Sequence, residues 1–212
     1  MKFKQLPCKS RSQAMQDIFA YNAVSDNTTY IEIGAYKPVH KNNTYVLDAN
    51  LGYRGFSVEL NQRWQQAWQE CTERHNPIYW VDALTFDYAA QCQILGLPRH
   101  LGYLSCDIEP PNNTLAALKR VISQGLSFDC ITFEHDKANP GFAQFLSQDI
   151  EQQATDFLAE HGYQLAVRDV WAGKNQEWLF ENWYVRADRP WQAMTYTQWR
   201  DEYAHYCQTQ KD

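Results

Sequence analysis

Short runs of apolar, β-branched and aromatic residues alternate along this chain with segments in which apolar residues recur every three or four positions. Runs of the first kind are typical of buried strands, and segments of the second kind are typical of amphipathic helices. Because parallel strands need a helical crossover between them, this alternation predicts a mostly parallel sheet with helices on its faces. The expected strands cover 30–34, 55–60, 78–81, 101–106 and 129–133.

Local signals indicate where several of the intervening helices begin and end. Asn61 is a natural N-cap and begins a helix that places Trp64 and Trp68 on one face. Gly96 and Gly162 are typical helix stops. Further helices are expected over 12–22, 43–50, 85–95 and 142–161, the last with Phe145 and Leu146 toward the core. One more helix is expected directly after Pro111.

The end of the chain follows a different pattern. Two strand-like segments, 163–170 and 178–186, are joined by a polar turn around Gly173 with no helix between them, so an antiparallel hairpin is expected. A last helix is expected over 191–207. A Rossmann-like, doubly wound α/β sheet of seven mostly parallel strands that ends in such a hairpin is typical of the class I methyltransferase fold.

Length and composition fit one domain. The 212 residues, 44% of them hydrophobic, are enough to bury a core. The expected domain covers 1–212, with 1–29 as an N-terminal helical segment and 187–212 as a C-terminal helix packed on the domain. The aromatic residues gathered near the C-terminus serve either core packing or a stacking surface for a flat substrate; they include Trp171, Trp178, Trp183, Trp191 and Trp199.

Cysteine usage and net charge indicate the cellular compartment and the classes of partner that this chain binds. The six cysteines are scattered without a CxxC pair, which favours a reducing compartment. No apolar run is long enough for a signal peptide or a membrane span, so a cytoplasmic location is expected. The net charge of −6 and the lack of a Lys/Arg stripe argue against nucleic acid as a partner. The chain could form a homodimer, and the sequence leaves its oligomeric state open.

The carboxyl ends of strands are where open α/β sheets bind ligands. Glu32 and Gly34 stand at the end of the first expected strand, and Glu59 ends the second, where an acid can accept hydrogen bonds from ribose hydroxyls. Asp82 and Ala83 follow the third strand, where they can meet an adenine edge. Each acid also has a plainer interpretation, as a surface charge or a helix cap.

The turn after the first strand discriminates between cofactors. A dinucleotide pyrophosphate needs several glycines and a free helix N-terminus. This loop has Gly34 alone, followed by Lys37 and Pro38, so NAD is disfavoured. S-adenosylmethionine carries no phosphate and tolerates such a loop, provided that carboxylates are available for its ribose and amino groups.

Acidic residues follow the fourth and fifth expected strands. Together with an imidazole, they could hold a divalent cation such as Mg²⁺ that lowers the pKa of a substrate hydroxyl. Alternatively, His135 or Asp107 acts directly as a general base. The plainer interpretation is that Asp107 orients the methionine moiety and His135 is structural. The cluster comprises Asp107, Glu109, Glu134, His135 and Asp136.

Four stretches between Ser12 and about Arg186 resemble the FkbM-like methyltransferases. SQAMQDIF from Ser12 is similar to the family's SQxxQDxF, and EIGAYKPVHKNNT from Glu32 to its DIGAxDGxxxSNT loop. LGYRGFSVELN from Leu51 is similar to LGWxGxxIEPN, and YLSCDIEPP from Tyr103 to LxIDxEGxE. Lys37 and Pro38 stand in place of the family's Asp-Gly, and Pro110 in place of a glycine.

The resemblance implies an S-adenosylmethionine site and a reacting centre near Asp107 and Glu109. His135 is a further catalytic candidate from the acidic cluster, independent of the resemblance. Family members typically methylate hydroxyl groups on sugars, glycolipids or polyketide-like products. The implied function is O-methyl transfer to a small molecule, sugar or glycan; the alternatives are a non-catalytic binding protein and a metal-dependent hydrolase. The expected cofactor residues are Glu32, Gly34, Ala35, Tyr36, Asn43, Thr44, Glu59, Leu60, Asp82, Ala83 and Asp107.

Overall fold

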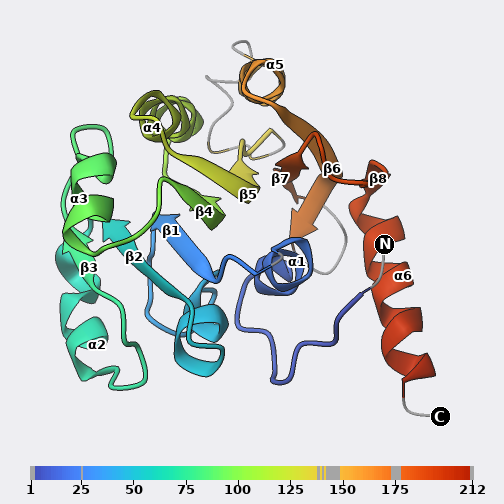
Figure 1. The fold of residues 1–212 in the computed structure, drawn as a ribbon, viewed down its shortest axis with the longest axis horizontal. Coiled ribbons are helices and arrows are strands. Elements are labelled where there is room, and N and C mark those ends of the chain that lie inside the picture. Colours follow the sequence, from blue (N-terminus) through green and yellow to red (C-terminus); the bar gives the residue numbers. More distant parts are fainter. Residues whose placement is uncertain are drawn as a thin grey trace.

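A computed structural model describes residues 3–24, 26–137, 139, 141, 149–172 and 178–210. Its centre is an eight-stranded sheet in the order β3-β2-β1-β4-β5-β7-β6-β8 (Figure 1). The strands are β1 Thr29–Ile33, β2 Arg54–Glu59, β3 Ile78–Trp80, β4 His100–Cys106, β5 Ser127–Glu134, β6 Tyr163–Ala172, β7 Trp178–Arg186 and β8 Met194–Thr195.

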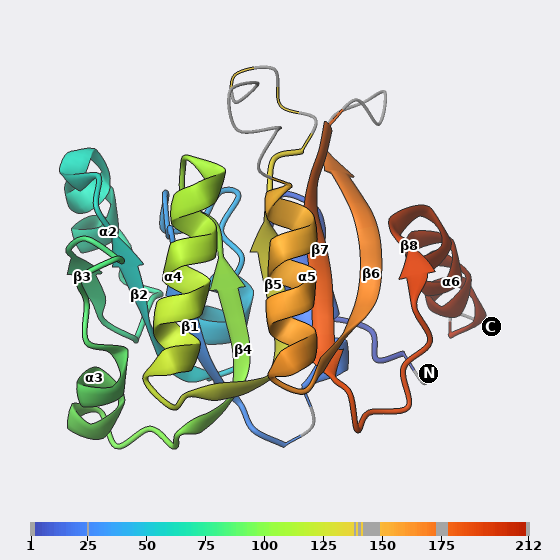
Figure 2. The same ribbon diagram turned by 90° about the horizontal axis from the view of Figure 1, so that it is seen from above.

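Helices cover both faces of this sheet. Helices α4 and α5 lie side by side over one face, while α1 and α6 lie on the other (Figures 1 and 2). The α-helices are α1 Gln16–Ala23, α2 Gln65–Glu70, α3 Tyr88–Ile94, α4 Pro111–Ser123, α5 Ile150–Glu160 and α6 Tyr196–Thr209. A π-helix, η1, covers Val46–Asn50 and a 3₁₀ turn, η2, covers Gln62–Trp64.

The strand directions confirm the expected α/β class. Strands β3, β2, β1, β4 and β5 are parallel neighbours, and β7 runs antiparallel to both β5 and β6. The chain ends in the antiparallel hairpin that the sequence predicts. The expected count of seven strands misses β8, two residues that pair in parallel with Val167 and Arg168 of β6. A pair this short has no periodicity that a sequence pattern could reveal.

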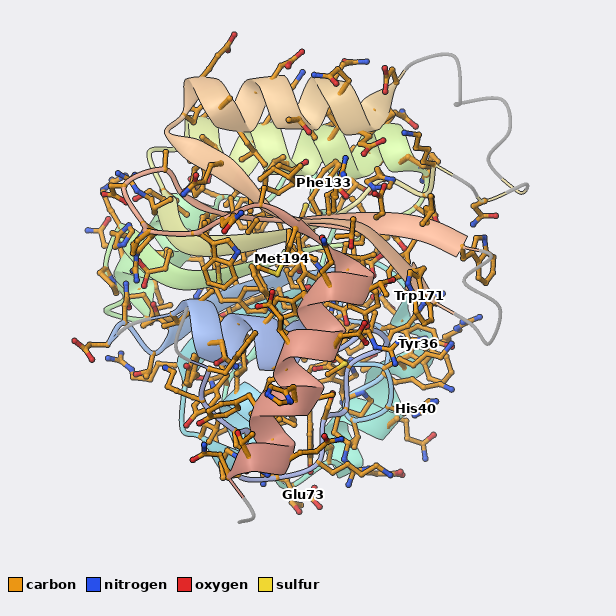
Figure 3. All side chains as sticks on the ribbon, turned by 90° about the vertical axis from the view of Figure 1, so that its right-hand side faces the viewer. Tyr36, His40, Glu73, Phe133, Trp171 and Met194 are labelled. Carbon is orange, nitrogen blue, oxygen red and sulfur yellow. The ribbon has the colours of Figure 1, made fainter. Side chains whose placement is uncertain are left out.

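Two apolar cores result, one on each face. Tyr88 of α3, Leu118 of α4 and Leu158 of α5 pack on the sheet in the first core. Phe19 of α1 and Trp199 of α6 lie in the second. Figure 3 shows both layers from the α6 side, with α4 and α5 on one face and α6 on the other. Every residue of β1 is buried, because this central strand is covered on both faces.

Several predicted helices begin or end differently from the pattern. The helix expected over 12–22 begins at Gln16, because the Asp17 carboxylate holds the preceding segment through Ser10 Oγ, Arg11 N and Ser12 Oγ at 2.7 to 2.8 Å. The helix expected over 43–50 is the π-helix η1. The one expected from 191 begins at Tyr196, where Thr195 and Gln198 form a capping box.

Other expected helix ends agree with the structure or lie outside the described residues. Asn61 accepts a hydrogen bond from Arg63 N, as an N-cap does. Helix α5 begins at Ile150, after Asp149. Phe142, Phe145, Leu146 and the turn at Gly173, Lys174 and Asn175 lie outside the described residues.

The C-terminal tryptophans differ in burial. Trp183 and Trp199 are fully buried, with ring centroids 5.1 Å apart and nearly perpendicular planes, which is core packing. Trp178 is 44% exposed. Among the described residues, no helix is long and apolar enough to span a membrane, and all six cysteines are free thiols.

Candidate active site

One cavity of about 690 Å³ opens at the carboxyl ends of the parallel strands. The strand order reverses between β1 and β4, and this is the switch point at which open α/β sheets bind ligands. The residues that line the cavity lie at or just after the ends of these strands. They include Glu32 of β1 and Gly34 after it, Glu59 of β2 and Leu60 after it, Asp82 and Ala83 after β3, Asp107 and Glu109 after β4, Glu134 of β5 and Asp136 after it, and Trp178 and Phe180 of β7.

The turn after β1 requires glycine. Gly34 has φ +85°, and a Cβ atom at this position would lie 1.6 Å from the carbonyl oxygen of Asp107. Gly34 N donates to Val58 O at 2.9 Å, and Asp107 N donates to Ile33 O at 3.0 Å. The loops after β1 and β4 therefore touch through their backbones, which brings Glu32 and Asp107 to one cavity.

Glu32 is held by a dense polar network. Its Oε2 accepts hydrogen bonds from Ser57 Oγ at 2.7 Å and Thr44 Oγ1 at 2.9 Å, and Arg74 lies 3.7 Å away. The Arg74 side chain is 3% exposed and also pairs with Asp48 through Nε at 2.8 Å. Burial raises the pKa of Glu32, and Arg74 and the hydrogen-bond donors oppose that shift. These contacts all reach Oε2, so Oε1 is the oxygen that can face a ligand.

Asn43 carries an unpaired acceptor at the cavity. Its Nδ2 donates to Ser105 Oγ on β4 at 3.0 Å. Its Oδ1 is buried and has no hydrogen-bond partner among the described residues. Since Asn43 lines the cavity and is only 7% exposed, this oxygen calls for a donor from a ligand.

The second strand ends at an acid and an exposed apolar residue. Glu59 accepts from Tyr36 N at 2.8 Å and from Asn61 N at 2.7 Å, which fixes its carboxylate at the cavity wall. Leu60 also lines the cavity and is 67% exposed. An apolar side chain left open inside a polar cavity is a suitable contact for a flat apolar ring.

The loop beyond Gly34 does not close the cavity. The Lys37 ammonium lies over the rings of Tyr36 and Trp64, 5.2 and 4.7 Å from their centroids. Neither Lys37 nor Pro38 lines the cavity. The two residues that depart from the family pattern therefore do not fill the cavity.

The opposite wall is acidic. The carboxyl groups of Asp107 and Glu134 hydrogen-bond to each other, so one proton is shared between them. Burial and the neighbouring Asp107 charge raise the pKa of Glu134 well above its ordinary value, so Glu134 is the protonated partner. Burial also raises the pKa of Asp136 to about 6. Glu109 is exposed at the rim.

His135 is separated from this wall. Its side chain is 4% exposed and does not line the cavity. Its Nδ1 accepts from Lys137 N at 3.2 Å, and burial lowers its pKa to about 4, so the ring is neutral. The chain leaves β5 at this point. His135 N and Asp136 N both donate to Phe180 O, at 2.7 and 3.0 Å, and Asp136 has φ +48°, so the backbone turns after Glu134.

Most of the predicted cofactor residues meet at this cavity. The exceptions are Ala35, whose side chain is buried, and Thr44, which supports Glu32. Tyr36 lines the cavity and is labelled in Figure 3. Within the described part of the chain, no group of three or more His, Cys, Asp or Glu side chains is arranged to hold a metal ion. Of the predicted cluster, Asp107, Glu109, Glu134 and Asp136 line the cavity without forming such a group.

Comparisons with known proteins agree at the level of the fold. No family model and no curated protein matches this chain. Among solved structures, the plantazolicin methyltransferase BamL, in complex with a triazolic desmethylPZN analog and SAH, has a TM-score of 0.55 and 10% identity, over 84% of this chain and 85% of that one. An rRNA methylase from Streptococcus thermophilus has a TM-score of 0.51 and 9% identity, over 84% and 98%.

A third structure extends the same set. The N-terminal domain of EvdMO1, solved in the presence of SAH and D-fucose, has a TM-score of 0.50 and 12% identity, over 86% of this chain and 85% of that one. This chain has the class I methyltransferase fold. At these identities the likeness shows the fold alone, and it does not confirm the FkbM-like subfamily.

Several residues of the cavity cannot be predicted from the strand ends alone. Gln13, Lys41, Arg63, Trp178 and Phe180 also line the cavity. Gln13 lies inside the SQAMQDIF stretch, so that stretch itself was a signal.

A second group acts behind the cavity wall. Gln16 Nε2 donates to Glu181 Oε2 at 2.6 Å, and burial raises the pKa of Glu181 to about 8. Arg74 and Glu181 are recognisable only from the tertiary contacts that bury them.

Proposed function

We propose that this protein is an S-adenosylmethionine-dependent methyltransferase of FkbM-like type that methylates a hydroxyl group of a small molecule, sugar or glycan. The observation that carries the proposal is the cavity at the switch point, because the acids of β1 and β2 and those after β4 and β5 all line it. Its volume of about 690 Å³ falls within the range of roughly 300 to 1,000 Å³ typical of small-molecule sites.

The residues present fit the cofactor. The unpaired Oδ1 of Asn43 needs a donor, and the methionine ammonium of the cofactor provides one. Glu59 is placed to accept from ribose hydroxyls, and the exposed Leu60 offers an apolar contact for adenine, with Asp82 and Ala83 at its edge. When bound, the cofactor supplies an electrophilic methyl group.

The chain itself must position the acceptor hydroxyl and remove one proton from it. Asp136 is suited to this step, because it lines the cavity and its pKa of about 6 keeps it mostly ionised near neutral pH while leaving it basic enough to accept a proton. Asp107 and Glu109 line the same wall and stay predicted members of the reacting centre. His135 stays a prediction as the base, and it is buried and does not line the cavity.

The alternatives have less support. A non-catalytic protein was suggested by Lys37 and Pro38, and neither residue enters the cavity. The acidic residues fit a metal-dependent hydrolase poorly, since the described residues form no metal-binding group, and no step is assigned to a metal. Acidic side chains outnumber Lys41 and Arg63 along the cavity, which disfavours a polyanion such as RNA. A cytoplasmic location fits this function and stays a prediction.

Isothermal titration with S-adenosylhomocysteine tests the proposal before any acceptor is known. We expect binding both with and without added Mg²⁺ after chelation. Glu59→Gln should weaken it about tenfold, because one charge-assisted hydrogen bond to the ribose is lost. Glu202→Gln on the exposed face of α6 is the matched control and should bind like the parent. Absence of binding by the folded parent protein in both conditions would overturn the proposal.

A further inference from the structure

Lys41 lines the cavity on a strained piece of backbone. Its φ is +56°, in the left-handed region that residues other than glycine seldom adopt. Its ammonium makes no ion pair, hydrogen bond or ring contact with any residue that the structure describes. Water can solvate an exposed ammonium, so the backbone is the feature that needs a cause. Strained positions of this kind cluster where a chain binds its ligands.

The residues that follow Lys41 hold it in this conformation. Asn42 is fully buried, and its Nδ2 donates to Ala35 O at 3.0 Å and to Lys37 O at 3.1 Å. The Nδ2 of Asn43 is bound in turn to a serine hydroxyl of β4 at 3.0 Å. Because two successive side chains are anchored, the turn fixes the place at which the lysine reaches the cavity.

The neighbouring Asn43 indicates which part of a ligand this lysine meets. Its unpaired Oδ1 is the proposed acceptor for the methionine ammonium of the cofactor. In an α-amino acid the ammonium and the carboxylate are attached to the same carbon, so the groups that bind them must lie close together. Lys41 and Asn43 are two positions apart in one turn, and both line the cavity. A lysine ammonium forms a charge-assisted hydrogen bond with a carboxylate.

The acids of the cavity make a cation necessary at this place. Glu32 and Asp107 line the same cavity, and a carboxylate brought near them is repelled unless a positive charge offsets theirs. Among the described lysines and arginines, Lys41 and Arg63 are the two that line the cavity. The Arg63 guanidinium lies 4.6 Å from the centroid of the Trp64 ring, in η2 directly after β2, where the ribose is proposed to bind. Lys41 is therefore the cation available to the methionine end.

We infer that Lys41 binds the α-carboxylate of the cofactor and so determines that the site takes S-adenosylmethionine in preference to its decarboxylated form. The inference rests on the proposed methyltransferase function and adds a residue that sets cofactor specificity. The competing assignments are that Lys41 is a surface charge without a ligand, or that Arg63 binds the carboxylate.

Two ligands that differ only in the carboxylate test this inference. Isothermal titration compares S-adenosylhomocysteine with decarboxylated S-adenosylhomocysteine, for the parent protein and for Lys41→Gln. The variant should bind S-adenosylhomocysteine about tenfold more weakly, because one charge-assisted hydrogen bond is lost. Its affinity for the decarboxylated ligand should equal that of the parent. Lys41→Arg keeps the positive charge and should restore the preference for the carboxylate.

A lysine of the same loop provides the matched control. Lys37→Gln removes the same charge at a position outside the cavity lining, and it should leave the ratio of the two affinities as in the parent. Lys41→Gln that changes both affinities by the same factor, or changes neither, overturns the inference about Lys41 alone. A loss confined to S-adenosylhomocysteine in Arg63→Gln, and absent from Lys41→Gln, also overturns it. Failure of the folded parent protein to bind S-adenosylhomocysteine overturns the proposed function instead.

Discussion

At the scale of single residues, two neighbours after β5 have pKa values that burial shifts in opposite directions. Burial lowers the pKa of His135 to about 4 and raises that of Asp136 to about 6. Only Asp136 lines the cavity. The sequence placed both residues at the correct sheet edge because strand ends follow from the hydrophobic pattern. The backbone turn at Asp136, with φ +48°, lies beyond the end of β5 and could not be predicted from the hydrophobic pattern.

The assignment of Asp136 as the base predicts a pH profile. With an acceptor in hand, kcat/KM of the parent enzyme should fall as the pH drops through about 6, where Asp136 becomes protonated. Asp136→Asn should lose roughly 10² to 10⁴-fold in kcat/KM and should lack this acidic limb. His135→Asn is the comparison variant and should retain the limb. A limb that vanishes in His135→Asn and persists in Asp136→Asn would reverse the assignment.

At the scale of elements, tertiary contacts determine the kind of helix formed at a position where the hydrophobic periodicity indicates only an ordinary helix. The segment expected as an ordinary helix over 43–50 forms η1, in which Leu51 N donates to Val46 O. Asp48 inside it is fully buried against Arg74, with Nε 2.8 Å from its carboxylate. A buried ion pair between an element and a distant loop leaves no trace in local spacing. The strands, whose signal is local, were predicted to within two residues at each end, except for the short β8, which was missed.

The contact between the loops after β1 and β4 can be tested with a pair of glycines. Gly34 and Gly52 both have positive φ, +85° and +68°, but a Cβ at Gly52 meets nothing within 4 Å. Gly52→Ala should cost about 1 to 2 kcal/mol from its backbone conformation alone. Gly34→Ala should cost at least about 2 kcal/mol more, because its methyl group collides with the Asp107 carbonyl. Urea unfolding measures both, and equal losses would show that the two loops separate without penalty.

At the scale of the whole molecule, the five parallel strands and the terminal antiparallel hairpin were predicted from the pattern of elements. The contact that joins the two ends of the chain could not be predicted from this pattern. Gln16 of α1 reaches Glu181 of β7, residues 165 positions apart, and Glu181 lies opposite Glu134 in the β5–β7 register. The buried Glu181 therefore connects the N-terminal helix to the strand behind the acidic wall, an arrangement that only the complete fold creates.

This contact predicts how stability varies with pH. Burial, with a smaller contribution from the Asp107 charge, raises the pKa of Glu181 from 4.5 to about 8 in the folded protein. The folded state therefore binds this proton more tightly than the unfolded state does. The stabilisation is fully present below the unfolded pKa near 4.5 and is lost progressively as the pH rises to about 8.

Glu181→Gln keeps the shape and the polar contact but cannot ionise, so its unfolding free energy should not contain this loss. Relative to the parent, the variant should gain stability between about pH 5 and pH 8, by at most a few kcal/mol, and the gain should level off above that range. His135 has the opposite pH dependence, because its lowered pKa removes stability as the pH falls from 6.5 toward about 4. Taking the difference in unfolding free energy between variant and parent at each pH, from urea unfolding, cancels this contribution. Glu202→Gln should give a flat difference. A difference that is equally flat for Glu181→Gln would mean that Glu181 is ionised in the folded protein at neutral pH, and that a further positive group stabilises it.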